Sequence, residues 1–114
     1  MLLGRVIGTV WATQKDEKLE GLRLLIVRAV DLELKPLSNF VIAVDTVSAG
    51  VGELVLVAQG SSARQTQETH NKPVDAVIMA IVENLNYDTI ENLMREYQGR
   101  EQDVSERINR VAET

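Results

Sequence analysis

Residues 41–64 most constrain what this chain can fold into, because short apolar runs alternate there with loops of small residues. Residues 40–45 and 53–59 are rich in Val, Leu and Ala, and each run has the length of a strand. A loop with two glycines joins these runs, and a second loop, residues 60–64, follows at once. We expect a positive φ at one or both glycines of the first loop, because the chain must turn there within a few residues.

Three further runs have strand-like composition, namely residues 5–13, 22–30 and 76–85. Both faces of the first run are apolar, so it needs cover on two sides, inside a layered fold or from another subunit. We expect residues 31–39 to form a polar loop, and Ser61 or Ser62 to cap a short helical turn. Residues 1–87 are therefore predicted to be all-β, a small five-stranded OB-like β-barrel.

The composition changes after Tyr87, and residues 88–114 are predicted to form an amphipathic helical C-terminal extension. Asp88 begins a sequence that resembles a capping box. An a/d-like apolar stripe follows, in which Glu101 takes one position; it comprises Ile90, Met94, Tyr97, Val104, Ile108 and Val111. We expect a break near Gly99 and docking on the barrel or on a neighbouring subunit. A bundle around a ring axis is the alternative that the seven-residue spacing favours.

Composition excludes several classes of protein. At 114 residues the chain can bury one modest core, and its formal charge of −5 argues against a partner with a phosphate backbone. Without cysteine it can form neither a disulfide nor a thiolate metal site, which fits a cytoplasmic location. His70 is the one histidine and has only Glu68 close by, so no metal site is expected. No apolar segment is long enough to suggest a membrane span.

Candidate catalytic groups are few. Asp45 and Glu53 flank the glycine loop and could be imagined as an acid and a base, but carboxylates at strand ends more often accept backbone N–H bonds. Ser61 and Ser62 have neither a nearby base nor a phosphate-binding motif beside them. We therefore predict that the chain is not an enzyme, with no catalytic residue and no cofactor.

A stand-alone binding module is the alternative function, because a five-stranded barrel also suggests the oligonucleotide-binding fold. Binders of single-stranded nucleic acid stack bases on aromatic side chains within a positive groove. This chain is acidic and has one Trp, two Tyr and one Phe. Nucleic acid is therefore not expected as a partner, although a peptide stays open.

Several motifs occur in order along residues 1–85. They are Gly4 to Thr13 with Lys15, Leu19 to Leu25, Ala43 to Glu53 with Val55 and Leu56, Gly60 to Arg64, and Pro73 to Ala76. Together they resemble the bacterial microcompartment vertex proteins, the EutN/CcmL family of ethanolamine utilisation and the carboxysome. In that comparison the third motif is the family's central hairpin. Ser48 stands where the family usually has glycine and Glu83 where it usually has aspartate, and residues 88–114 have no counterpart.

The resemblance implies a cytoplasmic structural protein: a homopentamer, with a hexamer as the other option, that closes the vertices of an icosahedral shell alongside other shell proteins. It places one loop at a pore near the ring axis or at a subunit contact, comprising Gly60, Ser61, Ser62, Ala63 and Arg64. It gives turn and interface roles to Asp45, Gly50, Gly52, Glu53 and Asp75. Because arginines near one axis repel each other, we expect Arg64 to pair with Glu53 or Asp75 at a contact.

Overall fold

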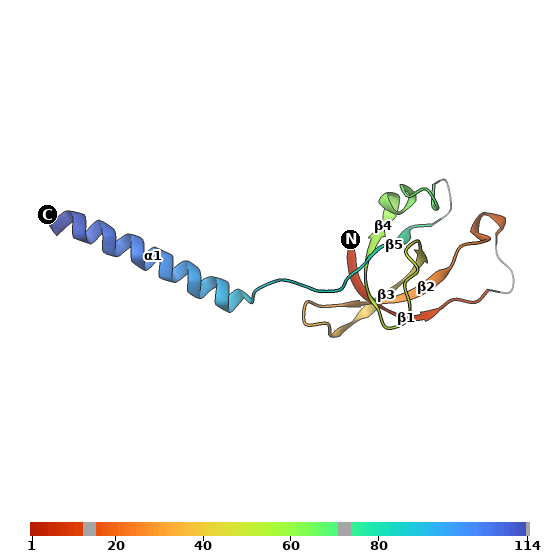
Figure 1. The fold of residues 1–114 in the computed structure, drawn as a ribbon, viewed down its shortest axis with the longest axis horizontal. Helices are drawn as coiled ribbons and strands as arrows, with labels where there is room; N and C mark the ends of the chain where they lie inside the picture. The colour runs from red at the N-terminus through yellow and green to blue at the C-terminus, as the bar shows by residue number, and fades with distance from the viewer. Residues whose placement is uncertain (13–15, 71–73, 114) are drawn as a thin grey trace.

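Five strands and one long helix make up the computed structural model, which describes residues 1–12, 16–70 and 74–113 (Figure 1). The elements are β1 (Leu2–Thr9), η1 (Glu17–Leu19), β2 (Leu24–Val30), β3 (Pro36–Asp45), β4 (Leu54–Gln59), η2 (Gly60–Arg64), β5 (Ala76–Ile81) and α1 (Ile90–Glu113). The predicted all-β barrel with a short helical turn and a C-terminal helix is confirmed. Among the described residues, no helix is both long and apolar enough to cross a membrane.

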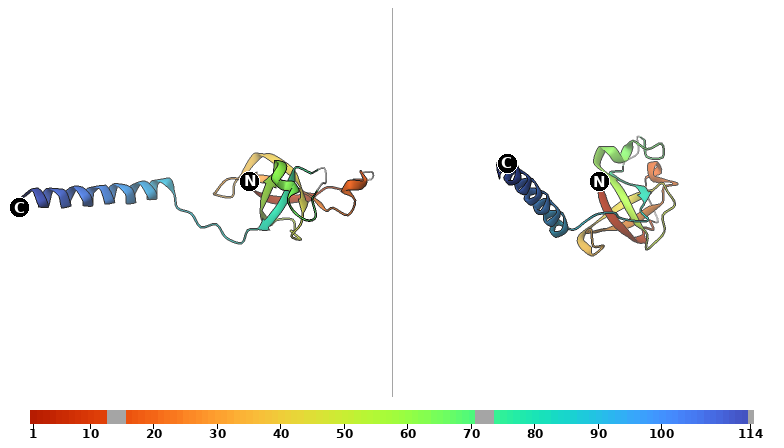
Figure 2. Two further views of the ribbon diagram at one scale, coloured as in Figure 1. Left: turned by 90° about the horizontal axis from the view of Figure 1, so that it is seen from above. Right: turned by 60° about the vertical axis from the view of Figure 1, so that its left-hand side comes forward.

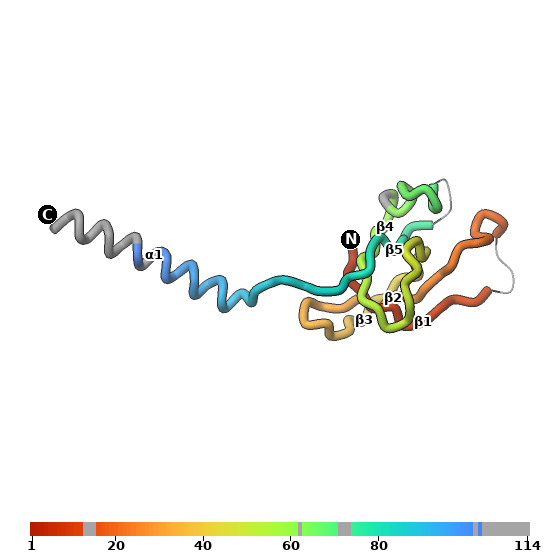
Figure 3. Tube along the Cα trace, viewed as in Figure 1, coloured from red at the N-terminus to blue at the C-terminus, as the bar shows by residue number. Residues whose placement is uncertain are grey.

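The strands close into a barrel in the order β1-β2-β3-β5-β4. All neighbours are antiparallel except β3 and β5, which run parallel over two residue pairs. The expected central hairpin is therefore wrong, because β5 lies between β3 and β4. The tube in Figure 3 shows the yellow-green connection from β3 to β4, which turns at the lower edge of the barrel before β4 begins. Thr46 fixes the start of this connection by donating its hydroxyl to Ile78 O, at 2.8 Å.

The core follows from the alternation of side chains along each strand. One set points inward and is completely buried: Val6, Leu25, Val27, Ala43, Val55, Val57 and Ile78. Gly4 pairs with Ala29 of β2 at a point where the two strands leave no room for a side chain. A Cβ on Gly4 would lie 2.5 Å from Val27 Cγ1 and 2.7 Å from Arg28 O, which no side chain tolerates without movement.

Strand ends differ from the predicted ones. β1 starts at Leu2 and ends at Thr9, and Ile7 and Trp11 are exposed in the single chain rather than covered. β3 starts at Pro36, so the predicted polar loop 31–39 is shorter. The Asp31 carboxylate closes that turn by accepting the N–H groups of Glu33 and Lys35. A proline is compatible with the first position of a strand, which is why polarity alone misplaced this boundary.

The helix α1 is continuous through Gly99, so the predicted break is wrong. Its N-cap is Thr89, whose Oγ1 accepts the N–H of Asn92 at 3.1 Å. Asp88, the predicted cap, instead accepts the N–H of Thr89 and the side-chain amide of Asn92. One glycine does not end a helix whose other positions favour it, because its cost is only about 1 kcal/mol relative to alanine.

Among the residues that the structure describes, the helix lies apart from the barrel of its own chain. Residues 82–89 run out as an extended thread, and both views in Figure 2 show the helix beyond the barrel. The molecule accordingly measures 81 × 27 × 22 Å. Docking on its own barrel, one of the two sites favoured from the sequence, is therefore wrong.

Candidate assembly surface

Asp45 organises the loop between β3 and β4. Its carboxylate is 2% exposed and lies 2.9 Å from Arg23 Nη1. The other carboxylate oxygen accepts the N–H groups of Val47 and Ala49, each at 3.1 Å, and Arg23 also donates to Ala49 O at 2.8 Å. The geometry leaves Asp45 bound to its own loop rather than free to exchange protons with a substrate.

Glu53 closes the other end of the same loop. Its Oε1 accepts the N–H of Gly50 at 2.6 Å, so both carboxylates beside the loop hold backbone N–H groups. Gly52 has a φ of 95°, which confirms the expectation of a positive φ at one of the two glycines. The N–H of Gly52 donates to Val6 O at 2.7 Å, and Arg5 donates to Gly52 O at 2.7 Å. These bonds tie the loop to β1 at the end of the barrel.

The loop predicted to lie at a ring axis is the 3-10 helix η2, Gly60–Arg64. The two serines lie inside this helix rather than at its cap, and the side chain of Ser62 is outside the described part. Ala63 is buried, whereas Ser61 and Arg64 are exposed. The N–H of Gly60 donates to Asp75 O at 2.7 Å, which joins the loop to the start of β5.

Thr69 anchors this loop and was not among the predicted site residues. Its side chain is completely buried, and its hydroxyl donates to Ala63 O at 2.6 Å. A second hydroxyl, that of Thr66, lies against it. A pair of threonines three residues apart after a helical turn is the sequence signal for such a local bond. Lys15 and Pro73, which belong to the family motifs, lie outside the described residues.

Arg64 has no ion pair within the described chain. Glu53, one of its two expected partners, is engaged with Gly50, and the Asp75 side chain is exposed. The expected pairing of Arg64 is a contact between subunits, so it remains a prediction. The described chain does show three other arginines bonded to backbone carbonyls, Arg5 to Gly52, Arg23 to Ala49 and Arg28 to Leu37.

The outer side of β2 and β3 exposes apolar residues on one continuous face. Ile26 and Ile42 are direct partners in the antiparallel ladder, and Phe40 follows Ile42 on the same side. Phe40 is 59% and Ile42 39% exposed. We call Ile26, Phe40 and Ile42 the strand face. Single exposed apolar residues are ordinary on a protein surface, whereas a paired set on neighbouring strands indicates a contact surface.

An open hollow of about 400 Å³ adjoins the strand face and is lined by Phe40, Ile42, Gly60 and Asp75. It lies where β3 leaves β5, since only Val44 and Asp45 of β3 pair with that strand. Within the described chain, the residues of β3 before Val44 pair only with β2, so their other edge is open. The hollow therefore brings together the η2 loop, one exposed carboxylate and an open strand edge.

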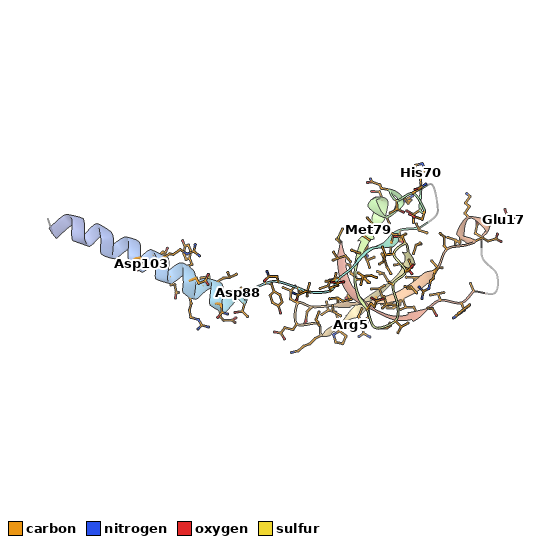
Figure 4. All side chains as sticks on the ribbon, viewed as in Figure 1. Arg5, Glu17, His70, Met79, Asp88 and Asp103 are labelled. Carbon is orange, nitrogen blue, oxygen red and sulfur yellow. The ribbon has the colours of Figure 1, made fainter. Side chains whose placement is uncertain are left out.

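The described residues contain no group of three or more His, Cys, Asp or Glu side chains that could hold a metal ion. Figure 4 shows His70 at the end of the barrel opposite Arg5, and Asp88 and Asp103 far out on the tail. The surface thus consists of an apolar strand face beside a loop, a strand edge and exposed charges. That combination defines a protein built for contact with other protein chains.

The chain belongs to the family described as ethanolamine utilisation protein EutN/carboxysome, whose sequence profile matches residues 1–83. Among its relatives, the microcompartment shell vertex protein GrpN of Rhodospirillum rubrum is 44% identical over 82% of this chain and 99% of its own length. The carboxysome shell vertex protein CcmL of a Synechocystis strain is 41% identical over 75% of this chain and 86% of its own.

Solved structures of the same family have a similar fold. CcmL of Gloeobacter violaceus superposes with a TM-score of 0.74, at 39% identity over 77% of this chain and 91% of its own. The structure described as the GrpN pentameric microcompartment shell protein gives a TM-score of 0.69, at 42% identity over 78% and 100%. The range that the family profile matches contains all five strands of the barrel. The family profile stops at residue 83, ahead of the helix α1 at Ile90–Glu113.

Proposed function

We propose that this chain forms a homopentameric ring that closes the vertices of a bacterial microcompartment shell, with other shell proteins around it. The observation that carries this proposal is the match to pentameric GrpN over the whole of that protein. Its relatives in the family are structural vertex proteins, and this chain shares their barrel. The role is therefore structural, and its location is the shell of a compartment inside the bacterial cytoplasm.

The strand face supports the ring. In a closed ring each subunit offers two different surfaces, one to each neighbour, and both must be covered. Phe40 and Ile42 are exposed in the single chain although they lie on paired strands. Burying aromatic and aliphatic side chains of this kind supplies most of the affinity at a subunit contact. The open edge of β3 beside them adds backbone groups that a neighbour can bind.

The η2 loop is proposed to face the ring axis, as a pore lining or as a subunit contact. The loop is held rigidly from inside, through Thr69 and Ala63, while Ser61 and Arg64 point to solvent. A fixed backbone with exposed polar side chains suits a narrow opening repeated five times. In this arrangement Asp75, across the same hollow, is the carboxylate available to a neighbouring Arg64.

Residues 1–87 are proposed to be the assembly domain, and residues 88–114 an addition to it. The family profile stops at residue 83, and the alignment with GrpN uses nearly all of GrpN but not all of this chain. The thread of residues 82–89 separates the two parts in space (Figure 1).

Native mass spectrometry at micromolar concentration tests the proposed function. We expect a species of five subunits, and a monomer would contradict the ring and favour a stand-alone binding module. Phe40→Asp should shift the population to smaller species, because it puts a charge into a buried contact. Phe40→Leu is the matched control and should keep the ring. Equal ring content in both variants would exclude the strand face from the contact.

A further inference from the structure

The helix α1 has an apolar stripe whose first three members are exposed in the single chain. Ile90, Met94 and Tyr97 are 75%, 51% and 55% exposed. An isolated helix is marginal in water, and most helix stability in proteins comes from packing of an apolar face. The stripe therefore requires a partner outside the chain's own barrel.

The spacing of the stripe distinguishes between possible partners. From Ile90 the stripe positions follow at steps of 4, 3, 4, 3, 4 and 3 residues; they are Ile90, Met94, Tyr97, Glu101, Val104, Ile108 and Val111. This is a strict seven-residue repeat, which drifts by about 20° per heptad on a straight helix. Such a repeat stays in contact with another helix when the two wind into a left-handed supercoil. Packing on the surface of a barrel does not require a seven-residue repeat.

Gly99 fits this arrangement. Counted from the stripe it falls at the position furthest from the partner helix, and the helix continues through it. A Cβ at Gly99 would meet nothing within 4 Å. The glycine therefore does not interrupt the contact surface.

Glu101 is the one charged residue in the stripe, and its neighbour in sequence provides the counter-charge. In a parallel coiled coil the residue before the Glu101 position of one helix packs beside the Glu101 position of the next. That residue is Arg100, whose only ion pair in the described chain is a loose one, 4.0 Å from Glu96. Copies of the same helix are thus complementary in charge at the point where the stripe is polar.

The ring makes such a contact reachable. Residues 82–89 can span at most about 26 Å when extended. The barrel is no wider than the two smaller dimensions of the chain, 27 and 22 Å, so five barrels around an axis have centres roughly 20 Å from it. Five tails tethered this closely have a mutual concentration on the order of millimolar. Rotational symmetry also makes all five helices parallel.

We propose that the α1 helices of the copies in one ring associate through this stripe as a parallel coiled coil on the ring axis, with Glu101 of each helix beside Arg100 of the next. This inference rests on the proposed ring. The partner of the exposed stripe is then the same stripe of the other copies, rather than a barrel.

Single-cysteine variants of the full-length chain test the coiled coil, because the chain has no cysteine of its own. Met94→Cys lies on the stripe and Glu96→Cys on the opposite side of the same helix turn, and both sites are exposed in the single chain. Under a mild oxidant we expect linked dimers to form at least about tenfold faster for Met94→Cys, since a disulfide needs Cβ atoms about 4 Å apart. Tyr97→Cys against Arg95→Cys repeats the comparison one step further on.

Native mass spectrometry of the same samples separates this inference from the proposed function. Monomers would overturn the ring itself. Intact rings with equal linking at both sites, or with linking at neither, would overturn the coiled coil alone. A linking rate that falls on dilution while ring mass stays constant would place the contact between rings and also overturn it.

The charge arrangement has its own readout. Glu101→Arg places five cations beside five arginines and should slow linking at Met94→Cys severalfold. The double exchange, Glu101→Arg with Arg100→Glu, restores opposite charges and should restore the rate. Equal rates in the single and double exchange would exclude the Glu101–Arg100 contact.

Discussion

Ser48 has a φ of 58° and is exposed, in the loop that Asp45 and Glu53 hold in place. This left-handed conformation is strained for residues with a side chain and free of strain for glycine. We expect Ser48→Gly to raise the free energy of unfolding by about 0.5–1 kcal/mol, measured by denaturant unfolding at matched protein concentration. Ser48→Ala is the control and should not stabilise. A loss of stability in Ser48→Gly would mean that the serine hydroxyl has an unrecognised structural role.

At Gly4 a side chain is excluded by lack of space, whereas at Ser48 it is disfavoured by the backbone φ. Gly4→Ala should lower the free energy of unfolding by about 1–3 kcal/mol, because the new methyl group meets Val27 and the Arg28 carbonyl. Gly8→Ala is the matched control on the same strand, where the nearest atom to a Cβ is 3.6 Å away. Thermal unfolding of both variants checks this, and equal effects would contradict the steric argument.

Arg64 belongs to the ring contact that we propose. Arg64→Ala should make the ring dissociate at higher protein concentration than the natural chain does, with little change in the fold of the barrel. The reason is that the proposed ring contact pairs Arg64 with a carboxylate of the neighbouring subunit, and the substitution removes that pair. Light scattering over a dilution series measures this, with circular dichroism as the check on folding. Rings that resist dilution as well as the natural chain would refute the pairing.

At the level of elements, the sequence predicted which segments become strands but not which strands pair. Residues 40–45 and 53–59 carry the strand pattern, and both are strands. The family resemblance predicted a hairpin of these two runs, yet β5 lies between them. Pairing is decided by contacts far apart in sequence, such as Thr46 with Ile78, and local composition carries no record of these. Thr69 was missed for a different reason: its bonds to Ala63 and Thr66 are local, but the threonine pair alone does not show that Thr69 is buried.

The helix α1 gives a prediction at the element scale. Gly99→Ala should stabilise the helix by about 1 kcal/mol, because glycine is the weak point of a continuous helix and a Cβ there meets nothing. Amide hydrogen exchange at residues 95–103 should slow accordingly, while exchange in β2 stays unchanged. If the chain were broken at Gly99, as its sequence suggested, alanine would instead extend the helix and add circular dichroism signal at 222 nm.

At the scale of the whole molecule, the barrel and the tail differ in how far the sequence predicts their structure. The barrel has its own buried core and matches the family profile, so its fold could be inferred from ordered motifs in the sequence. The tail has helix periodicity without a surface to pack on, and periodicity alone could not say where it goes. The seven-residue repeat was visible in the sequence, but Gly99 and Glu101 argued against reading it as a coiled coil. The helix α1 continues through Gly99, so the glycine does not break the repeat. Arg100 can supply the opposite charge beside Glu101 in a neighbouring helix.

If residues 1–87 form the ring and residues 88–114 only add to it, truncation after Tyr87 has a predictable outcome. Removing residues 88–114 leaves the closed barrel, the strand face and the η2 loop in place, so the ring should still form. If the coiled coil adds to the ring contact, the truncated ring should dissociate at higher concentration than the full-length ring, because five tethered contacts are lost together. Analytical ultracentrifugation of both forms over a dilution series measures the difference. The full-length chain carrying Glu101→Arg is the control that keeps the mass of the tail while weakening its association, and it should lie between the two. Failure of the truncated chain to form any ring would show that the tail belongs to the assembly domain and that the boundary at Tyr87 is misplaced.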